Sequence, residues 1–279
     1  MLRKLFQNRP ELKSPRELGL MREAGKVVAT ALRLARGMVK PGVETIEIDR
    51  AIEAHYKAHN AQPLFKGYPG PKVPFPAVTC ISVNEQVVHG IPGRRPLREG
   101  DIVKLDTACK LNGWCADAAV TLPVGEIRPE LKRLIQVAWE TLNIAIVEMG
   151  RCRRWSEVAL RMQQHVERAG FSVVTQYVGH GIGRIMHEAP QVPNYVNHEV
   201  RKHDFRLEPG LVLAVEPMVN LGRRGDVDVL RDHWTVVTRD RLPSAHVEHT
   251  LAVTADGVKT LTADEETPPT PPAALPPAV

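Results

Sequence analysis

Four stretches of the chain carry apolar residues at the three-to-four-residue spacing of an amphipathic helix. This spacing predicts helices over about 15–36, 45–59, 128–149 and 156–169. The first begins with Ser14, Pro15 and Glu17, which form a capping box with proline in the first helical turn. Since the polar residues fall on the opposite faces, the apolar stripes indicate core packing rather than binding surfaces.

Short runs rich in β-branched residues lie between these helices and predict strands. The runs are AVTCISV (77–83), DIVKLDTACKL (101–111), AAVTLPV (118–124), SVVTQYV (172–178), LVLAVEPMV (211–219), HWTVVTR (233–239) and HTLAVTA (249–255). This mixture of helices and strands predicts an α+β fold.

The two halves of the chain repeat the same order of elements. Each half has a helix, then a strand and the triplet HGI, which begins at His89 and at His180. The segment REGDIVKLD (98–106) parallels LEPGLVLAVE (207–216), and each ends in an acidic residue. Such a repeat predicts two similar halves that face each other.

A second matching pair of segments follows in each half. ADAAVTLPVG (116–125) parallels VEHTLAVTADG (247–257), and each has a carboxylate where the strand begins, Asp117 or Glu248. With the halves face to face, these residues would meet Asp106 and Glu216 at one centre. Buried carboxylates repel one another unless cations neutralise them, so the centre predicts a pair of divalent metal ions. Two adjacent ions suit hydrolysis.

The stretch YVGHGIGRIMHEAP (177–190) places His180 and His187 among three glycines. Glycines at 181 and 183 disfavour a helix, so we expect a loop or strand. The expected reason for the glycines is close approach of the backbone to the metal ions and the substrate. Surface histidines in an ordinary loop are the alternative interpretation.

Composition adds little to this picture. The 279 residues are 43% hydrophobic and carry a formal net charge of +5. A mildly basic balance leaves open either an acidic partner, such as RNA or the ribosome, or an ordinary solvated surface. Four cysteines without a CxxC pair indicate reduced thiols and a cytoplasmic location. No apolar run is long enough to predict a membrane span.

The motifs CISVNEQVVHGIP, GDIVKLD, GHGIGRIMHEAPQVPNY, EPGLVLAVEPMVN and HVEHTLAVT resemble those of the type I methionine aminopeptidases. The resemblance covers roughly residues 14–258. It implies the pita-bread fold, in which two pseudo-symmetric αβ halves share a central curved antiparallel sheet covered by helices. The metallopeptidase domain so implied spans 14–262; the sequence before it predicts an N-terminal arm (1–13), and the prolines after it predict a disordered tail (263–279).

The resemblance implies roles for particular residues. Asp117 and Glu248 would bridge two metal ions, Asp106 would bind one of them, and His180 and Glu216 would bind the other. The ions would be Mn, Fe(II), Co or Zn. Glu216 would also act as proton shuttle, His187 would bind the substrate carbonyl, and His89 would contact the scissile amide. The methionine pocket would consist of Phe65, Tyr68, Cys80, Met186 and Trp234.

The implied activity is removal of the N-terminal methionine from nascent polypeptides by a monomeric enzyme. Association with the ribosome is left open. One alternative is an Xaa-Pro aminopeptidase or dipeptidase, whose members share the five ligands but usually carry a further N-terminal domain. The other is a catalytically impaired pita-bread protein that binds RNA or the ribosome.

Several positions depart from the family pattern. Lys104 falls on the same strand face as Asp106, where the family commonly has an uncharged amide, and a cation there would compete with metal unless it points away. Ala108 replaces a frequent hydroxyl residue. His246 replaces a usual glutamine, and it either supports a metal ligand or belongs to the rim of the site. The segment 69–77 lengthens the loop beside the pocket.

Overall fold

The computed structural model describes residues 10–264. Residues 1–9 of the expected arm and residues 265–279 of the expected tail lie outside the described residues, so the disorder predicted for the tail stays a prediction. Within the described part of the chain, no helix combines the length and the apolar character needed to cross a membrane.

The four predicted helices are confirmed. They are α2 (Pro15–Met38), α3 (Thr45–Ala58), α4 (Pro129–Met149) and α5 (Trp155–Arg168). The capping box of α2 is also confirmed, because the Glu17 carboxylate accepts from the Ser14 backbone N–H at 2.8 Å and the Ser14 hydroxyl accepts from the Glu17 N–H. A further helix, α6 (His198–Lys202), was not predicted because five residues are too short to show a helical period.

A nine-stranded antiparallel sheet forms the centre of the fold. Its main path runs β1-β3-β4-β13-β8-β6-β7, while β2 pairs with β3 and β14 with β13. The bounds are β1 (Gln62–Pro63), β2 (Thr79–Val83), β3 (Ile102–Leu111), β4 (Trp114–Pro123), β6 (Gly179–Gly181), β7 (Glu188–Val192), β8 (Val212–Val215), β13 (Glu248–Thr254) and β14 (Gly257–Thr260).

Two small sheets flank the large one. One pairs β10 (Val227–Val229) with β11 (Val236–Thr238), and the other has the order β12-β9-β5, with β5 (Ser172–Val173), β9 (Met218–Asn220) and β12 (Ser244–His246). The strand predicted over 172–178 is wrong beyond Val173. Val174 is buried in an apolar cluster and Gln176 accepts from the Val227 N–H, so this run packs as a loop.

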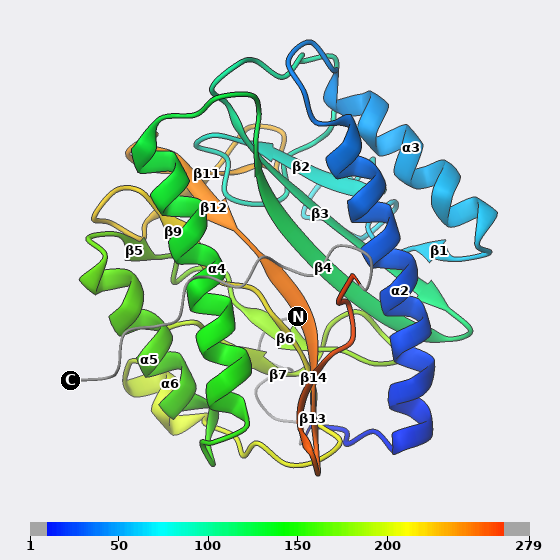
Figure 1. Ribbon diagram of the computed structural model, residues 1–279, viewed down its shortest axis with the longest axis vertical. Coiled ribbons are helices and arrows are strands. Elements are labelled where there is room, and N and C mark those ends of the chain that lie inside the picture. The colour runs from blue at the N-terminus through cyan, green and yellow to red at the C-terminus, as the bar shows by residue number, and fades with distance from the viewer. Residues whose placement is uncertain (1–9, 265–279) are drawn as a thin grey trace.

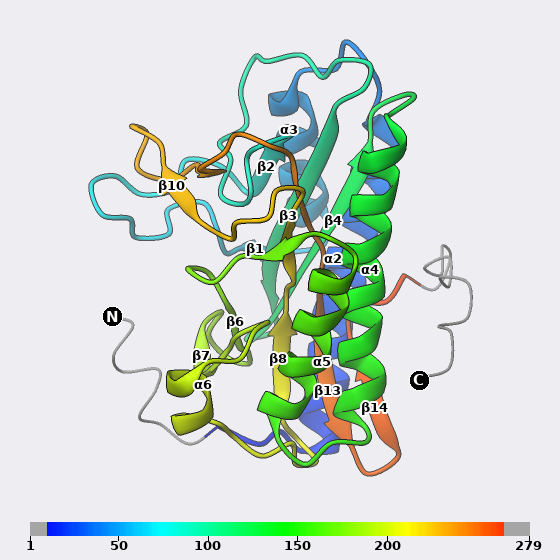
Figure 2. The same cartoon turned by 90° about the vertical axis from the view of Figure 1, so that its left-hand side faces the viewer.

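The predicted repeat is confirmed, because β3–β4 and β13–β8 are equivalent pairs that meet where β4 and β13 lie side by side. Helices α2 and α3 pack on the first half, and α4 and α5 pack on the second (Figure 1). Figure 2 shows α2, α4 and α5 on one side of the sheet, with β10, the short helix α6 and several loops on the other. Functional residues are therefore expected on the side opposite α2, α4 and α5.

The last described residues return to the first helix. Leu261 lies against Gly25 of α2 so closely that a Cβ at Gly25 would fall 1.9 Å from its carbonyl oxygen. Arg22 donates to the carbonyl oxygens of Leu261 at 2.7 Å and Ala263 at 3.0 Å. This contact, the 261–263 clasp, joins the end of the second half to the helical layer of the first.

Candidate metal centre and active site

The predicted metal ligands lie on the sheet face opposite the helices. On β4, Ala116, Ala118 and Val120 pack into the core beneath α2 and α3, so alternation turns Asp117 to the other face. On β13, Leu251 and Val253 pack against the core of the second half, and alternation turns Glu248 the same way. The central strand pair thus presents one carboxylate from each half.

The structure brings these side chains together. Ligand atoms of Asp117, His180 and Glu248 lie within 4.8 Å of one another, and so do those of Glu216, His246 and Glu248. His180 Nε2 lies 4.0 Å from Asp117 Oδ2 and 3.8 Å from Glu216 Oε1. Asp106 lies on β3, which pairs with β4, and the Asp117 carboxyl is close enough to help raise the pKa of Asp106. All five predicted ligands therefore line one centre.

The buried carboxylates have oxygen atoms without partners. Asp106 Oδ1, Asp117 Oδ1 and Glu248 Oε1 have no hydrogen-bond partner among the described residues. Burial first, and then neighbouring carboxylates, raise the pKa values of Asp106, Glu216 and Glu248 well above their usual range, and burial raises the pKa of Asp117 to about 7. Because orphaned carboxylate oxygens are the ligands that divalent cations need, the cluster fits a metal site.

His180 is positioned to act as a nitrogen ligand. Burial, followed by the nearby His187, lowers its pKa to about 3, so the ring is neutral at pH 7. Its Nδ1 lies 3.0 Å from the Gly181 carbonyl oxygen and takes the proton that this acceptor requires. The lone pair on Nε2 therefore faces the carboxylates, which is the arrangement of a metal-binding histidine.

The glycines of 177–190 lie against neighbouring parts of the protein. A Cβ at Gly179 would fall 2.3 Å from the Ala214 carbonyl oxygen, and one at Gly181 would fall 2.2 Å from that of Ala189. At Gly183 it would collide with the side chains of Lys13 and Glu188. These glycines allow tight packing against neighbouring parts of the protein, and the expectation that their backbone passes close to metal and substrate stays a prediction.

His187 and His89 lie beside the cluster. The His187 ring is 4.3 Å from that of His180, and its Nδ1 is 2.7 Å from the Tyr68 hydroxyl. His89 has a left-handed backbone, with φ of 58°, and its ring contacts Tyr177 and Trp234. Burial lowers the pKa of each histidine to about 4, so both are neutral at pH 7. Left-handed backbone at a non-glycine residue is typical of functional sites.

The five residues predicted to form the methionine pocket share one apolar cluster, Phe65, Tyr68, Cys80, Met186 and Trp234. Sequence reasoning missed Phe75, which is buried there and meets the rings of Phe65 and Trp234 edge to face. The signal was present as an aromatic residue within the lengthened loop at 69–77. Ala108 is fully buried in the same cluster, where its methyl group adds to the apolar surface.

Lys104 points away from the carboxylates. Its ammonium donates to the carbonyl oxygens of Asn84 at 2.7 Å and Ser244 at 2.9 Å. Burial lowers its pKa to about 7. No ion pair within residues 10–264 joins Lys104 to Asp106. The structure therefore does not support competition between the Lys104 ammonium and a metal ion for this carboxylate.

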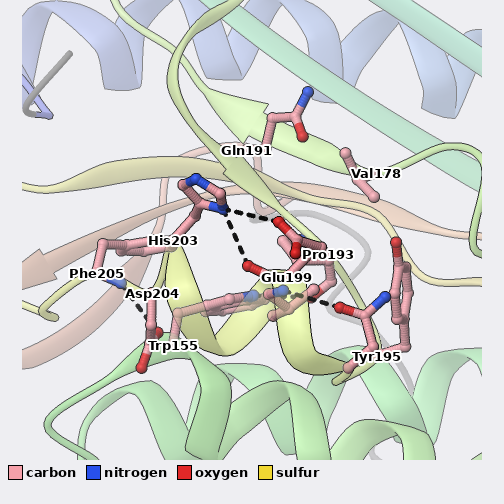
Figure 3. A pocket seen from close by; sticks show the side chains of 11 residues that line it. Trp155, Val178, Gln191, Pro193, Tyr195, Glu199, His203, Asp204 and Phe205 are labelled. Carbon is pink, nitrogen blue, oxygen red and sulfur yellow. Dashed lines mark hydrogen bonds and ion pairs between the residues drawn. The ribbon is translucent and has the colours of Figure 1, made fainter. Parts of the chain in front are cut away.

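A separate cavity of about 80 Å³ lies beside α6 (Figure 3). Trp155, Tyr195 and His203 line it, and no residue of the predicted site does. His203 Nδ1 is 3.1 Å from the Glu199 carbonyl oxygen, and the Trp155 indole donates to Pro193. The polar side chains around this cavity are largely paired, unlike those of the carboxylate cluster.

Comparison with known proteins agrees with this geometry. The model of metallopeptidase family M24 matches residues 19–255. Methionine aminopeptidase 1 of Bacillus subtilis is 47% identical over 250 residues, which cover 90% of this chain and 98% of the relative. Methionine aminopeptidase of Clostridium perfringens is 45% identical over 251 residues, with the same shares covered.

Solved structures lead to the same family. The methionine aminopeptidase of Thermotoga maritima superposes with a TM-score of 0.85 at 39% identity, covering 92% of this chain and 100% of that one. A prolidase from Pyrococcus furiosus superposes at 0.69 with 19% identity and 66% of its length covered, which shows a shared fold only. The fold is thus the pita-bread fold, and the chain belongs to metallopeptidase family M24 and, within it, to the methionine aminopeptidases.

Proposed function

We propose that this chain removes the N-terminal methionine from nascent polypeptides by hydrolysis of the first peptide bond, with two divalent metal ions as cofactors. The observation that carries the proposal is the centre of buried, unpartnered carboxylate oxygens beside a neutral histidine. Its donor set of oxygen atoms and imidazole nitrogen suits Mn, Fe(II), Co or Zn.

The ligands divide between the two halves. Asp117 and Glu248, on adjacent central strands, would hold the ions together with Asp106, His180 and Glu216. Bound divalent ions supply a nucleophile at neutral pH and polarise the scissile carbonyl. Glu216 is the residue proposed to take up a proton on a carboxylate oxygen and pass it to the leaving amine.

His187 is proposed to hydrogen-bond the substrate carbonyl oxygen. Since its ring is neutral, only one nitrogen carries a proton. When the Tyr68 hydroxyl donates to Nδ1, that proton is on Nε2, which can then donate to the oxygen as negative charge develops. His89 is proposed to contact the scissile amide. Both histidines bind and orient the reacting groups without changing their own charge.

Selectivity for methionine is proposed to come from the apolar cluster beside the metal centre. Phe65, Phe75 and Trp234 share this cluster with Cys80 and Met186. A flexible thioether packs well against aromatic rings and other sulfur atoms. Asp106 pairs with Cys80 of this cluster across β3 and β2, and it would receive the free amine of the first residue.

The rival functions have less support. The fold similarity to prolidases covers only part of those longer chains, whereas the methionine aminopeptidases match over almost their whole length. The impaired RNA-binding protein was suggested by Lys104, and that ammonium is bound by two carbonyl oxygens. A cytoplasmic location and a monomeric state are proposals consistent with four free cysteines. Ribosome association rests on the net charge alone.

Hydrolysis of the peptides Met-Ala-Ser, Leu-Ala-Ser and Ala-Pro-Ser by the metal-reconstituted chain tests the proposal. We expect kcat/KM for Met-Ala-Ser to exceed that for Leu-Ala-Ser by about 100-fold, the scale of discrimination that one apolar pocket provides. A chelator should abolish the activity. Preferred cleavage of Ala-Pro-Ser, or no cleavage with any of the four metals, would contradict the proposal.

A further inference from the structure

His246 is buried beside the metal centre and is held there by its backbone. It is the last residue of β12, which pairs with β9. Its N–H donates to the Thr121 hydroxyl oxygen at 2.9 Å, and its carbonyl oxygen accepts from the same hydroxyl. Because Thr121 lies on β4, the strand that also carries Asp117, this pair of bonds fixes His246 relative to the predicted ligands.

The His246 ring has no hydrogen-bond partner among the described residues. The residue is 1% exposed, and neither Nδ1 nor Nε2 is partnered. Its Nε2 lies 3.5 Å from Glu216 Oε2, which is longer than an ordinary N–H···O bond. Burying an imidazole without a partner is unfavourable, so this orientation requires a ligand for one of its nitrogens.

His249, two residues past Val247 on β13, provides the contrast. It is also a histidine close in sequence to Glu248, but its Nδ1 is bonded to the Thr262 hydroxyl at 2.9 Å and its ring lies near Trp139 of α4. Its side chain therefore faces the helical layer. Of these two histidines, only His246 faces the carboxylates with its nitrogens unfilled.

We propose that Nε2 of His246 is a sixth protein ligand of the metal centre and binds the ion held by Glu216. The inference extends the proposed function, since it assumes that the carboxylate cluster holds metal. Ligand atoms of one ion, each about 2.0–2.2 Å from it, must lie within roughly 4.4 Å of one another. The 3.5 Å between His246 Nε2 and Glu216 Oε2 meets this condition.

A sixth ligand of this kind changes metal preference. The ion next to Glu216 would then bind two imidazoles, from His180 and His246, where an amide at position 246 would leave one. Imidazole nitrogen favours Co, Zn and Fe(II), while carboxylate oxygen favours Mn. This chain is therefore expected to prefer Co(II) over Mn(II) more strongly than a variant with glutamine at this position.

Metal titration of the full chain tests the proposal without an activity assay. Metal-free protein is titrated with Co(II) and with Mn(II) in a calorimeter, for wild type, His246→Gln and the matched control His249→Gln. We expect His246→Gln to weaken Co(II) binding by about 10-fold more than Mn(II) binding and to alter the visible absorption of bound Co(II). His249→Gln is expected to leave both the preference and the spectrum unchanged.

Crystals of the Co(II)-loaded wild type give a second measurement that needs no variant. Anomalous density about 2.0–2.2 Å from His246 Nε2 is the expected result. The proposal is overturned if this distance exceeds hydrogen-bond length, or if His246→Gln weakens both metals equally with an unchanged spectrum, as for a residue that merely orients Glu216. Failure of the wild type to bind either metal would instead overturn the proposed function itself.

Discussion

The two halves of the molecule bring similar ligands to the metal centre on different supports. In the first half, Asp106 and Asp117 lie within β3 and β4, two regular ten-residue strands. In the second half, His180 lies on the three-residue strand β6, next to an irregularity in its pairing with β7. Glu216 lies just beyond β8, and His246 ends another short strand.

This difference shows how a repeated fold can divide its tasks. The long strands of the first half fix two carboxylates through many backbone hydrogen bonds. The interrupted strands of the second half release backbone for loops, and one such loop carries Met186 and His187 towards the centre. The first half therefore holds its two carboxylates within long strands, whereas the second half presents His180, Glu216 and His246 on or beside short ones.

The largest expected effect comes from removing either central carboxylate. Asp117→Asn in the first half and Glu248→Gln in the second should each lower kcat/KM for Met-Ala-Ser by about 1,000-fold or more, because each residue is proposed to bind both ions. Each variant should also raise the melting temperature of the metal-free chain, since one member of a crowded buried acid cluster is neutralised.

Kinetics and thermal unfolding of the metal-free and metal-loaded variants measure both effects. Equal losses in the two variants would establish that the two central positions, which lie on the paired strands β4 and β13, are equivalent. A loss in one variant only would mean that Asp117 and Glu248 are not equivalent and that only one of them binds both ions. Unchanged metal affinity in both would remove the basis of the metal centre.

A smaller effect is expected at the loop of the second half. Lys13 Nζ lies 2.8 Å from Glu188 Oε2, and Glu188 Oε1 accepts from the N–H groups of Arg184 and Ile185, at 2.8 Å and 3.3 Å. The Lys13 side chain is almost fully buried. Through this network, Lys13, which precedes the first helix and lies outside the sheet, holds the loop that ends at His187.

Lys13→Met should lower kcat/KM by about 10-fold through a misplaced His187, and should destabilise the fold by about 3 kcal/mol because Glu188 loses its buried partner. Lys13→Arg is the matched control, since it retains the charge and should restore most of the activity. Steady-state kinetics and denaturant unfolding report the two quantities. An inactive Lys13→Arg with normal stability would show that the charge is not what positions the loop.

The smallest predicted effect concerns pH. The raised pKa of Asp117 stabilises the metal-free fold below about pH 3.8, and this contribution is lost as pH rises through about 7. The lowered pKa of His180 acts in the opposite direction, since its contribution is present above 6.5 and is lost as pH falls towards about 3. In the metal-free chain, the Asp117 carboxyl therefore favours the folded state at low pH, whereas the His180 imidazole favours it at high pH.

Divalent ions compete with protons for both kinds of ligand. We expect the increase in melting temperature on metal addition to be larger at about pH 7.5 than at about pH 5.5, by a few degrees. Scanning calorimetry with and without Co(II) at the two pH values measures this difference. A larger increase at the lower pH would mean that protons and metal do not share the same groups.

Sequence patterns predicted those residues whose positions are set by regular helices and strands. Amphipathic spacing located α2 to α5, and the repeated carboxylates located Asp106, Asp117, Glu216 and Glu248, because a strand places alternate residues on one face. These positions need only the local period and the repeat. The residues implied by the family resemblance, such as Phe65 and Trp234, also lie together.

Patterns failed where contacts join distant segments. Lys104 is turned from the site by Ser244, which is 140 residues away in sequence. The glycine at 183 is required by Lys13, from outside the motif. Phe75 reaches the pocket only because its loop folds back on Tyr68 and Trp234. Such contacts depend on the path of the whole chain, which no local period encodes.

The 261–263 clasp bears on how a substrate enters. A hinge motion that separated the halves on the helical side would pull Leu261 from Gly25 and break both hydrogen bonds of Arg22. The 261–263 clasp thus holds the two halves together on the helical side of the sheet. A polypeptide substrate is therefore expected to approach the proposed metal centre from the sheet face opposite α2 and α4, without separation of the two halves.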